Sequence, residues 1–427
     1  MSFLPMQVKI TPAMVIHGAV FLGLAGLVAL PGVTATASMI MILAGLLLVC
    51  RRSIRLPHGD QANRWILAMS LLPMAYLVNM AWFGWEWPKL ENPSKMLLAI
   101  LIFLAIREWG LSSRTAILGC FVGAIIAGIV SAYQSIVLDL AQAHGYMWHI
   151  PFGNFSLLLA FLSLLGVLYT LEHRGRHKGL ILAIGLMATV AGLMASAASG
   201  ARGGWIAIPI LGLILVTSLS HVRFKFYAVL VIIISLPLIY QSTPIVKQRV
   251  DLATHEIMHH LQNKPDNATS LSSLGTRLEM WRYGMNVFVQ HPVMGVGIAT
   301  FEEQARQDIE QGLTNPGILG QGSMRHHHLH NDAITILARM GLVGFLAWVM
   351  FWILSWSFFT HGLRAGKQHH EASFFSWMGL LTLSGIFMFS LSDSMLGTSA
   401  GTLCFVFLLA TAAGGLSYHA RKTPENS

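Results

Sequence analysis

The chain has 427 residues, of which 55% are hydrophobic and only 11% are charged, and its formal net charge is +9. Soluble domains carry roughly 25% charged residues, so this composition excludes an ordinary soluble protein and indicates a polytopic membrane protein. Most of the basic residues lie in short connections between apolar segments, where membrane topology accounts for them. We therefore expect no nucleic-acid partner.

Apolar windows of about 20 residues, the length that crosses a hydrocarbon core, recur along nearly the whole chain. They predict an all-α bundle of about twelve transmembrane helices, at approximately residues 12–30, 33–50, 65–83, 95–108, 115–138, 154–171, 180–198, 204–220, 224–240, 331–360, 373–392 and 397–418. The first apolar run lacks a basic leader and a clear cleavage site, so we expect it to remain as a span. The tenth is longer than a bilayer needs, so we expect its start to stand above the membrane.

Lysine and arginine collect on one side of this arrangement. The connections and tails of that side hold 16 of them, against 3 in the short loops of the other side. The basic side therefore faces the cytoplasm, with both termini, and the long loop before the tenth span faces the periplasm of a bacterium with two membranes. We expect three parts: spans 1–9 in residues 1–240, a helical periplasmic loop in 241–330, and spans 10–12 with a short tail in 331–427.

The long loop is too apolar for a disordered linker and contains three helical patterns. Apolar residues at helical spacing between 246 and 261 predict an amphipathic helix at the membrane surface. A second helix is predicted to start at Thr276, an N-cap with Glu279 three residues on, and to end at Gln290. A third is predicted over residues 298–311, so the loop is expected to form a small helical cap over the outer face of the bundle.

Arg202 lies in the sequence SGARGGW between two apolar spans. Flanking glycines allow close approach of a ligand, and a guanidinium offers paired donors to a phosphate. The alternative is an interfacial arginine that reaches for water or pairs with a carboxylate such as Asp393.

Arg277 and Arg282 lie in GTRLEMWRYG. Five residues apart on a helix, they do not share one face well, so at most one is expected to point into a central site. The alternative for either is a solvated helix face.

The sequence RHHHLHND, residues 325–332, places four histidines in five positions. They could form a metal site with His291 or Asp332, although no HExxH-type pair occurs. They could instead be a polar loop, which is our interpretation of His326 and His327. A single base is the third interpretation: in an extended segment His328 and His330 point to one side, and Asn331 or Asp332 can cap the tenth span and fix His330 at its start.

Several local patterns together resemble the O-antigen ligase family. His330-Asn331 is followed, after nine residues, by Gly341-Leu342-Val343-Gly344, which resembles the H[NSQ]-x9-Gxx[GTY] signature of these enzymes. The stretch Ser199-Gly200-Ala201-Arg202-Gly203 resembles the arginine–glycine segment of the family. Gly275-Thr276-Arg277 with Trp281, and then His291-Pro292-x-x-Gly295-x-Gly297, resemble its periplasmic loop.

The resemblance implies a GT-C-like membrane glycosyltransferase in the bacterial inner membrane. Its donor would be undecaprenyl-pyrophosphate-linked O-antigen, and its acceptor a sugar hydroxyl of the lipid A–core. In this interpretation His330 is the base, and Arg202 and Arg277 stabilise the pyrophosphate, so that no metal or cofactor is needed. Substrate contacts are expected from a further set of residues: Arg282, His328, Asn331, Trp281 and Asp393.

Three alternatives remain open at this stage. An O-antigen polymerase uses the same donor with a second lipid-linked glycan as acceptor. A protein O-oligosaccharyltransferase of the same superfamily usually carries a sizeable soluble region after its last spans, whereas this chain stops at Ser427, which favours a ligase. A transporter or flippase would also fit twelve spans, but a transport site is expected to hold ionisable groups at mid-membrane, where Arg339 is the exception.

Overall fold

The computed structural model describes residues 11–53, 60–172, 177–219, 273–319, 328–365 and 369–422, and every regular element in these ranges is a helix. The longer helices are α1 (Pro12–Ala25), α2 (Pro31–Cys50), α3 (Gln61–Phe83), α4 (Glu91–Trp109), α5 (Ser113–Ala132), α6 (His149–Glu172), α7 (Lys178–Ala198), α8 (Ile208–Ser218), α11 (Ser273–Gln290), α12 (Phe301–Glu310), α13 (Asp332–Ala365), α14 (His370–Ser390) and α15 (Ser399–Arg421). Short turns of helix are η1 (Trp87–Leu90), η2 (Tyr133–Val137), η3 (Arg202–Ala207) and η4 (Pro316–Leu319).

The predicted spans coincide with helices, except that the ninth, residues 224–240, lies outside the described residues together with the amphipathic helix expected within 246–261. Eight of the described helices are long and apolar enough to cross a membrane, and two apolar helical segments are shorter, Pro12–Ala25 and Arg202–Ser218. The prediction of an all-helical polytopic protein is therefore confirmed, whereas the number of twelve spans stays a prediction.

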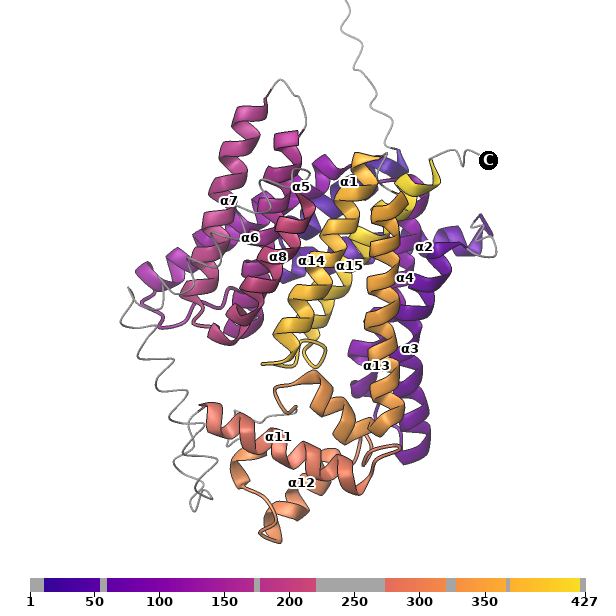
Figure 1. Cartoon of the computed structure of the whole chain (residues 1–427), viewed down its shortest axis with the longest axis vertical. Helices are drawn as coiled ribbons and strands as arrows, with labels where there is room; N and C mark the ends of the chain where they lie inside the picture. The colour runs from indigo at the N-terminus through magenta and orange to yellow at the C-terminus, as the bar shows by residue number, and fades with distance from the viewer. Residues whose placement is uncertain are drawn as a thin grey trace, which may run out of the picture.

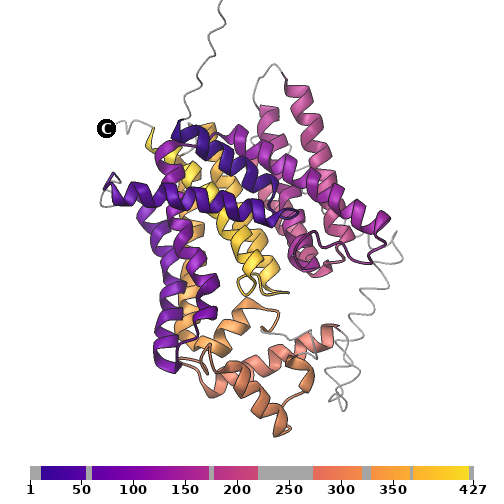
Figure 2. The same ribbon diagram turned by 180° about the vertical axis from the view of Figure 1, so that it is seen from behind.

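The helices form a bundle with α14 and α15 in its middle (Figures 1 and 2). Helices α3, α4 and α13 stand on one side of this pair, and α5 to α8 stand on the other. Burial agrees with this order, because 78% of the apolar window of α14 and 83% of that of α15 lie inside the protein, against 28% for α7. The outer helices thus keep an apolar face for lipid, as their sequences require.

Residues 273–319, which we call the cap, lie across one end of the bundle (Figure 1). Their apolar side chains form a small core of their own, centred on Met280, Tyr283 and Phe301, that also includes Leu329 and Ala338 from the segment that follows the cap. Of the three helices predicted for the loop, the first lies outside the described residues, and the other two are present as α11 and α12. Helix α11 begins at Ser273, three residues before the predicted N-cap Thr276, and α12 covers only Phe301–Glu310 of the predicted 298–311.

Helix α13 is divided at Gly341, whose backbone angles, φ 58° and ψ −153°, are not helical. The turn before this kink, residues 332–340, runs at a steep angle to the upright remainder of α13 and lies between the cap and the ends of α14 and α15 (Figure 1). The excess length predicted for the tenth span is therefore a separate short helix, residues 332–340, which begins two residues after His330.

The end of the bundle opposite the cap is fastened by a buried ion pair. Arg107 of α4, only 2% exposed, pairs with Asp60, and its Nη1 also donates to Ser417 Oγ of α15 at 2.9 Å. Asp60 in turn caps α3, because its Oδ1 accepts the Ala62 N–H at 2.9 Å. Burial raises the pKa of Asp60, but the hydrogen bonds and charge of Arg107 outweigh it, so this pKa lies below its ordinary value of 3.8.

We predict that Asp60→Asn lowers the free energy of unfolding by about 3 kcal/mol, because it leaves the buried Arg107 charge without its partner. Thermal unfolding in detergent measures the loss. The matched control is Glu108→Gln, which breaks an exposed pair with Arg421 at 3.7 Å and should cost under about 1 kcal/mol. Because the pKa of Asp60 is lowered, its contribution is present above pH 3.8 and is lost as the pH falls through the lowered value. Equal losses in the two variants would contradict the prediction.

Candidate active site

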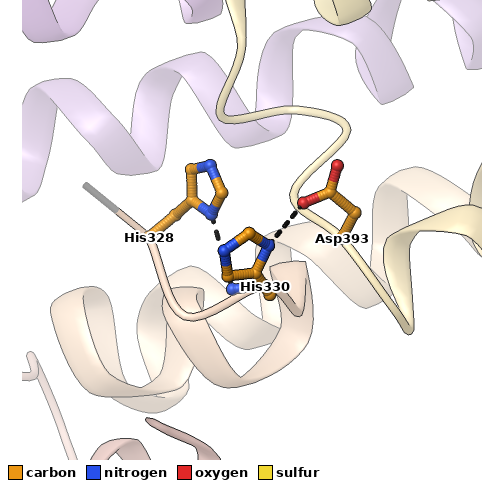
Figure 3. Close-up of side chains that lie close together, drawn as sticks. All are labelled: His328, His330 and Asp393. Atoms are coloured by element: carbon orange, nitrogen blue, oxygen red, sulfur yellow. Dashed lines mark hydrogen bonds and ion pairs between the residues drawn. The ribbon is translucent and has the colours of Figure 1, made fainter. Parts of the chain in front are cut away.

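His330 lies at the junction between the cap and α13, where its Nδ1 is 2.7 Å from Oδ1 of Asp393 (Figure 3). Asp393 belongs to the loop of residues 391–398 that joins α14 to α15, which we call the α14–α15 loop. The His330 side chain is 14% exposed and that of Asp393 is 5% exposed. Two residues 63 positions apart in the chain thus form a largely buried histidine–carboxylate pair.

The backbone of His330 adopts the left-handed conformation, with φ 50°, which a residue with a side chain rarely takes. Such strain persists only where neighbouring contacts hold the residue in place. Here Trp281 of α11 donates its indole N–H to the Leu329 carbonyl at 3.0 Å, and the Leu329 N–H donates to Thr335 Oγ1 at 3.2 Å. Trp281, predicted to bind substrate, is therefore placed where it anchors the backbone next to His330.

Asn331 caps α13, as the sequence predicted, because its Oδ1 accepts the Ile334 N–H at 3.1 Å. The same side chain donates from Nδ2 to the Leu391 carbonyl at 3.1 Å. It thereby ties the start of α13 to the first residue of the α14–α15 loop. Asn331 is only 8% exposed, so its side chain is engaged chiefly within the protein.

Asp332 holds the same loop from the other side of Asp393. Its Oδ1 accepts from Ser394 Oγ at 2.6 Å, and its Oδ2 accepts the Leu396 N–H at 3.2 Å. Asn331 and Asp332 therefore bracket Asp393, and the two residues that follow His330 set the position of its partner. The sequence offers Asp332 as a metal ligand or helix cap, but this contact joins segments far apart in the chain and no local pattern encodes it.

The electrostatic setting favours an ionised Asp393. Burial raises its pKa, but the hydrogen bond with His330 and the nearby rings of His328 and His330 outweigh burial, so the pKa of Asp393 lies below the ordinary carboxyl value. An ionised carboxylate can only accept hydrogen bonds, so Nδ1 of His330 is the donor and carries the proton. Nε2 is then the basic nitrogen of the neutral ring, which is the tautomer required of a general base.

His328 lies against His330, with ring centroids 4.7 Å apart and planes at 80° (Figure 3). Its Nδ1 accepts the backbone N–H of His330 at 3.4 Å. One ligand-type atom from each of His328, His330 and Asp393 lies within 4.8 Å of the others. His326 and His327 lie outside the described residues, so their interpretation as a polar loop stays a prediction.

Gly203 brings the arginine segments against the α14–α15 loop. A methyl group in place of its hydrogen would lie 2.9 Å from Ser392 Oγ and 3.6 Å from Nη1 of Arg277. Arg202, which is exposed, directly precedes Gly203, and Ser392 directly precedes Asp393. Gly203 therefore lies close both to Arg277 and to the loop that carries the partner of His330, and Arg202 is the residue that precedes it in the same segment.

Arg282 lies differently from Arg277. Its side chain is 61% exposed and its Nη1 is 3.8 Å from Oε1 of Glu279, one turn back on α11. Arg277 is half-buried and reaches Gly203. The helical spacing predicted that at most one of the two points into a central site, and the structure brings only Arg277 into contact with the converging segments.

The glycine signatures of the sequence interlock in space. Four backbone hydrogen bonds join residues 292–297 to residues 338–343. Gly295 and Gly341 both have positive φ. A side chain on Gly295 would meet the backbone of residues 339–340, and one on Gly341 would meet the backbone of Val293 and Gly295. The glycine motifs thus allow the backbone of the cap to pack closely against the kink of α13. This packing fixes the short helix of residues 332–340, and His330 lies just before that helix.

Asn79 of α3 completes this junction and was not singled out from the sequence. It is 1% exposed, its Nδ2 donates to the Met294 carbonyl at 2.9 Å, and its Oδ1 accepts the Ile298 N–H at 2.9 Å. A buried amide within an apolar helix needs such partners. The sequence shows Asn79 as a polar residue within an apolar helix, which indicates a buried hydrogen-bonding role, but it does not identify the segment that Asn79 contacts.

We predict that Gly341→Ala lowers the free energy of unfolding by at least about 2 kcal/mol more than Gly312→Ala does. Both glycines have positive φ, 58° and 70°, so both variants carry the backbone strain. Only at Gly341 does the added methyl group meet backbone, 2.4 Å from the Val293 carbonyl oxygen, whereas nothing lies within 4 Å at Gly312. Thermal unfolding of the two variants in detergent tests the difference, and similar losses would show that the junction accommodates a side chain.

Residues 187–349 match the family model of O-antigen ligases. The chain is also 27% identical, over 330 residues, to an uncharacterized protein of Haemophilus influenzae, and the alignment covers 74% of this chain and 79% of that protein. The segment that matches the family model contains Arg202, Arg277 and His330, and it ends before Asp393. Residues 187–349 are therefore similar to O-antigen ligases, which confirms the predicted resemblance and supports an enzyme of ligase or polymerase type.

Proposed function

We propose that this protein is an O-antigen ligase that transfers O-antigen polysaccharide from undecaprenyl pyrophosphate to a sugar hydroxyl of the lipid A–core. The reaction takes place at the periplasmic face of the bacterial inner membrane, with both termini of the enzyme in the cytoplasm. The observation that carries the proposal is the His330–Asp393 pair, at 2.7 Å, on a loop whose Ser392 lies close to Gly203, as Arg277 also does. We assign Arg277 and Arg202, which directly precedes Gly203, as the cations of the site that holds this base.

The two arginines act on the donor. A pyrophosphate is already a good leaving group, so its departure needs stabilisation of negative charge more than protonation. Fixed guanidinium groups of Arg202 and Arg277 supply this stabilisation where the charge grows, and their paired donors match the geometry of phosphate oxygens. They take the part that a metal ion plays in many nucleotide-sugar enzymes, so the proposed reaction needs no metal or cofactor.

His330 acts on the acceptor. Its Nε2 accepts the proton of the attacking sugar hydroxyl while the hydroxyl oxygen bonds to the anomeric carbon of the donor. The bond from that carbon to the pyrophosphate breaks, and its electron pair leaves with undecaprenyl pyrophosphate. Direct displacement inverts the anomeric configuration. Asp393 holds the imidazole in the required tautomer and stabilises the imidazolium, which then releases its proton to water.

The remaining residues of the predicted site support these three. Trp281 and Asn331 position the backbone of His330, and Asp332 positions Asp393. We assign His328, beside His330, and the exposed Arg282 to contacts with the sugar or phosphate groups of the substrates.

We predict that His330→Ala lowers the rate of transfer by about 10²–10⁴-fold, the usual contribution of a general base. The assay mixes purified protein with undecaprenyl-pyrophosphate-linked O-antigen and lipid A–core and follows the ligated product. His361→Ala, an exposed histidine on the same helix at its far end, is the matched control and should retain the rate. Normal transfer by His330→Ala would remove this residue from the proposed role.

The same assay separates the ligase from a polymerase. We expect product when lipid A–core is the acceptor and none when a second undecaprenyl-linked O-antigen is offered alone. The reverse pattern would replace the proposed acceptor and leave the roles of the arginines and His330 standing.

We predict that Arg202→Lys lowers the rate of transfer by roughly tenfold or more, because a point charge does not reproduce the paired donors of a guanidinium. Arg306→Lys is the matched control, since this arginine lies on α12 with 53% of its side chain exposed, so the same change there should leave the rate unaltered. Full activity of Arg202→Lys would favour the alternative in which this arginine only reaches for interfacial water.

We predict that Asp332→Ala lowers kcat about tenfold while changing KM much less. Alanine removes the acceptors of both the Ser394 hydroxyl and the Leu396 N–H, so these contacts to the α14–α15 loop are lost and Asp393 shifts relative to His330. Initial rates over a range of acceptor concentrations measure the two constants. A rise in KM at constant kcat would indicate a role in binding the acceptor instead.

A further inference from the structure

We propose that His328, His330 and Asp393 also form an inhibitory binding site for a divalent transition-metal ion of the Zn²⁺ class. The site itself is inferred from the geometry alone. Its inhibitory effect rests on the proposed function, because it requires that His330 be the base of the transfer reaction.

The three side chains offer the donor set that Zn²⁺ prefers. Two imidazoles and one carboxylate each supply a ligand atom, and these atoms lie within 4.8 Å of one another. Ligand atoms around a tetrahedral Zn²⁺ are roughly 3.3 Å apart, given bond lengths of about 2.0–2.1 Å. The pair His330 Nδ1 and Asp393 Oδ1, now 2.7 Å apart, would open slightly, and any separation near the 4.8 Å limit would close.

The surrounding structure holds these side chains close together before any ion binds. Asn331 and Asp332 fasten the loop of Asp393, and the Trp281 contact to Leu329 fastens the backbone beside His330. His328 is the least constrained of the three. The hydrogen bond that its Nδ1 accepts from the His330 backbone is 3.4 Å long, and a bond of this length is easily replaced by a metal–nitrogen bond.

Coordination would disable the base through either ring nitrogen. At Nε2 the ion occupies the lone pair that accepts the proton of the sugar hydroxyl. At Nδ1 the ion requires the other neutral tautomer, so the ring proton moves from Nδ1 to Nε2, which can then no longer accept the proton of the hydroxyl, and Asp393 becomes a ligand instead of the partner that orients the ring. Three protein ligands leave a fourth position for water, so the ion also occupies space where the acceptor hydroxyl must approach.

A direct binding experiment tests the site without reference to catalysis. The whole protein is purified in detergent, treated with EDTA and freed of it, and then titrated with Zn²⁺ against a fluorescent competing chelator. We expect one tight site, whose affinity falls at least about tenfold in His328→Gln and in Asp393→Asn. The matched control is His291→Gln, an exposed histidine of the cap, whose affinity should equal that of the unchanged protein.

Cobalt supplies a signature that distinguishes this site from adventitious histidines. Co²⁺ bound by three protein ligands in a tetrahedral site absorbs strongly in the visible range, and this absorption should vanish in His328→Gln but persist in His291→Gln. An affinity for Zn²⁺ that is the same in His328→Gln as in the unchanged protein would overturn the site, as would a Co²⁺ spectrum that this substitution leaves unaltered.

The transfer assay tests the inhibition. EDTA-treated protein should be fully active, lose activity as Zn²⁺ fills the site, and recover it when EDTA is added again. Activation by Zn²⁺ would overturn the inhibitory role. Zn²⁺ binding that depends on His328 but leaves transfer intact would uphold the site and overturn His330 as the base. If the unchanged protein transfers no glycan at all, the proposed function fails, and the binding titration still decides whether the metal site exists.

Discussion

The contact between His330 and Asp393 depends on one structural constraint, the attachment of the α14–α15 loop to the first residues of α13. Asn331 and Asp332 bind this loop on both sides of Asp393. The carboxylate of Asp393, at the end of the central helix pair, is therefore held next to His330 at the edge of the cap. A buried carboxylate would otherwise favour its neutral form. Asp393 orients the imidazole of His330, and this imidazole in turn favours the ionised form of Asp393.

The kink at Gly341 is the second requirement for this arrangement. A straight α13 would carry residues 332–340 along the axis of the remaining helix, away from the end of α14. The kink turns this segment across the bundle end, and the backbone of residues 292–297 fits against it because Gly295 and Gly341 have no side chains. The nine residues between Asn331 and Gly341 form the short helix before the kink. The sequence motif therefore fixes both the residue that caps this helix and the glycine at which it ends.

Much of this fold is predictable from the sequence, because a helix in lipid must satisfy its own backbone and reveals itself as a long apolar run. The cap of α13 at Asn331 and the separation of Arg277 from Arg282 were likewise predictable, since both follow from local helical geometry. That Asp393, rather than another carboxylate of the outer face, would contact His330 was not predictable, and neither were the contacts of Asn79. Each joins residues dozens to hundreds of positions apart, and no periodicity in the chain encodes which apolar helix packs beside which.

The geometry that suits His330 to the proposed role of base would also favour the binding of a metal ion. A general base must present a lone pair near a second polar group and remain neutral, and those are the conditions under which an imidazole binds a transition-metal ion. A lone histidine would bind such an ion weakly. His328 and Asp393 add two further donors within 4.8 Å, so the contacts that orient His330 also supply further ligands for a coordination sphere. In the proposed reaction, arginines stabilise the pyrophosphate in place of a metal ion, and this is an advantage because the enzyme then has no need to admit an ion that would block its base.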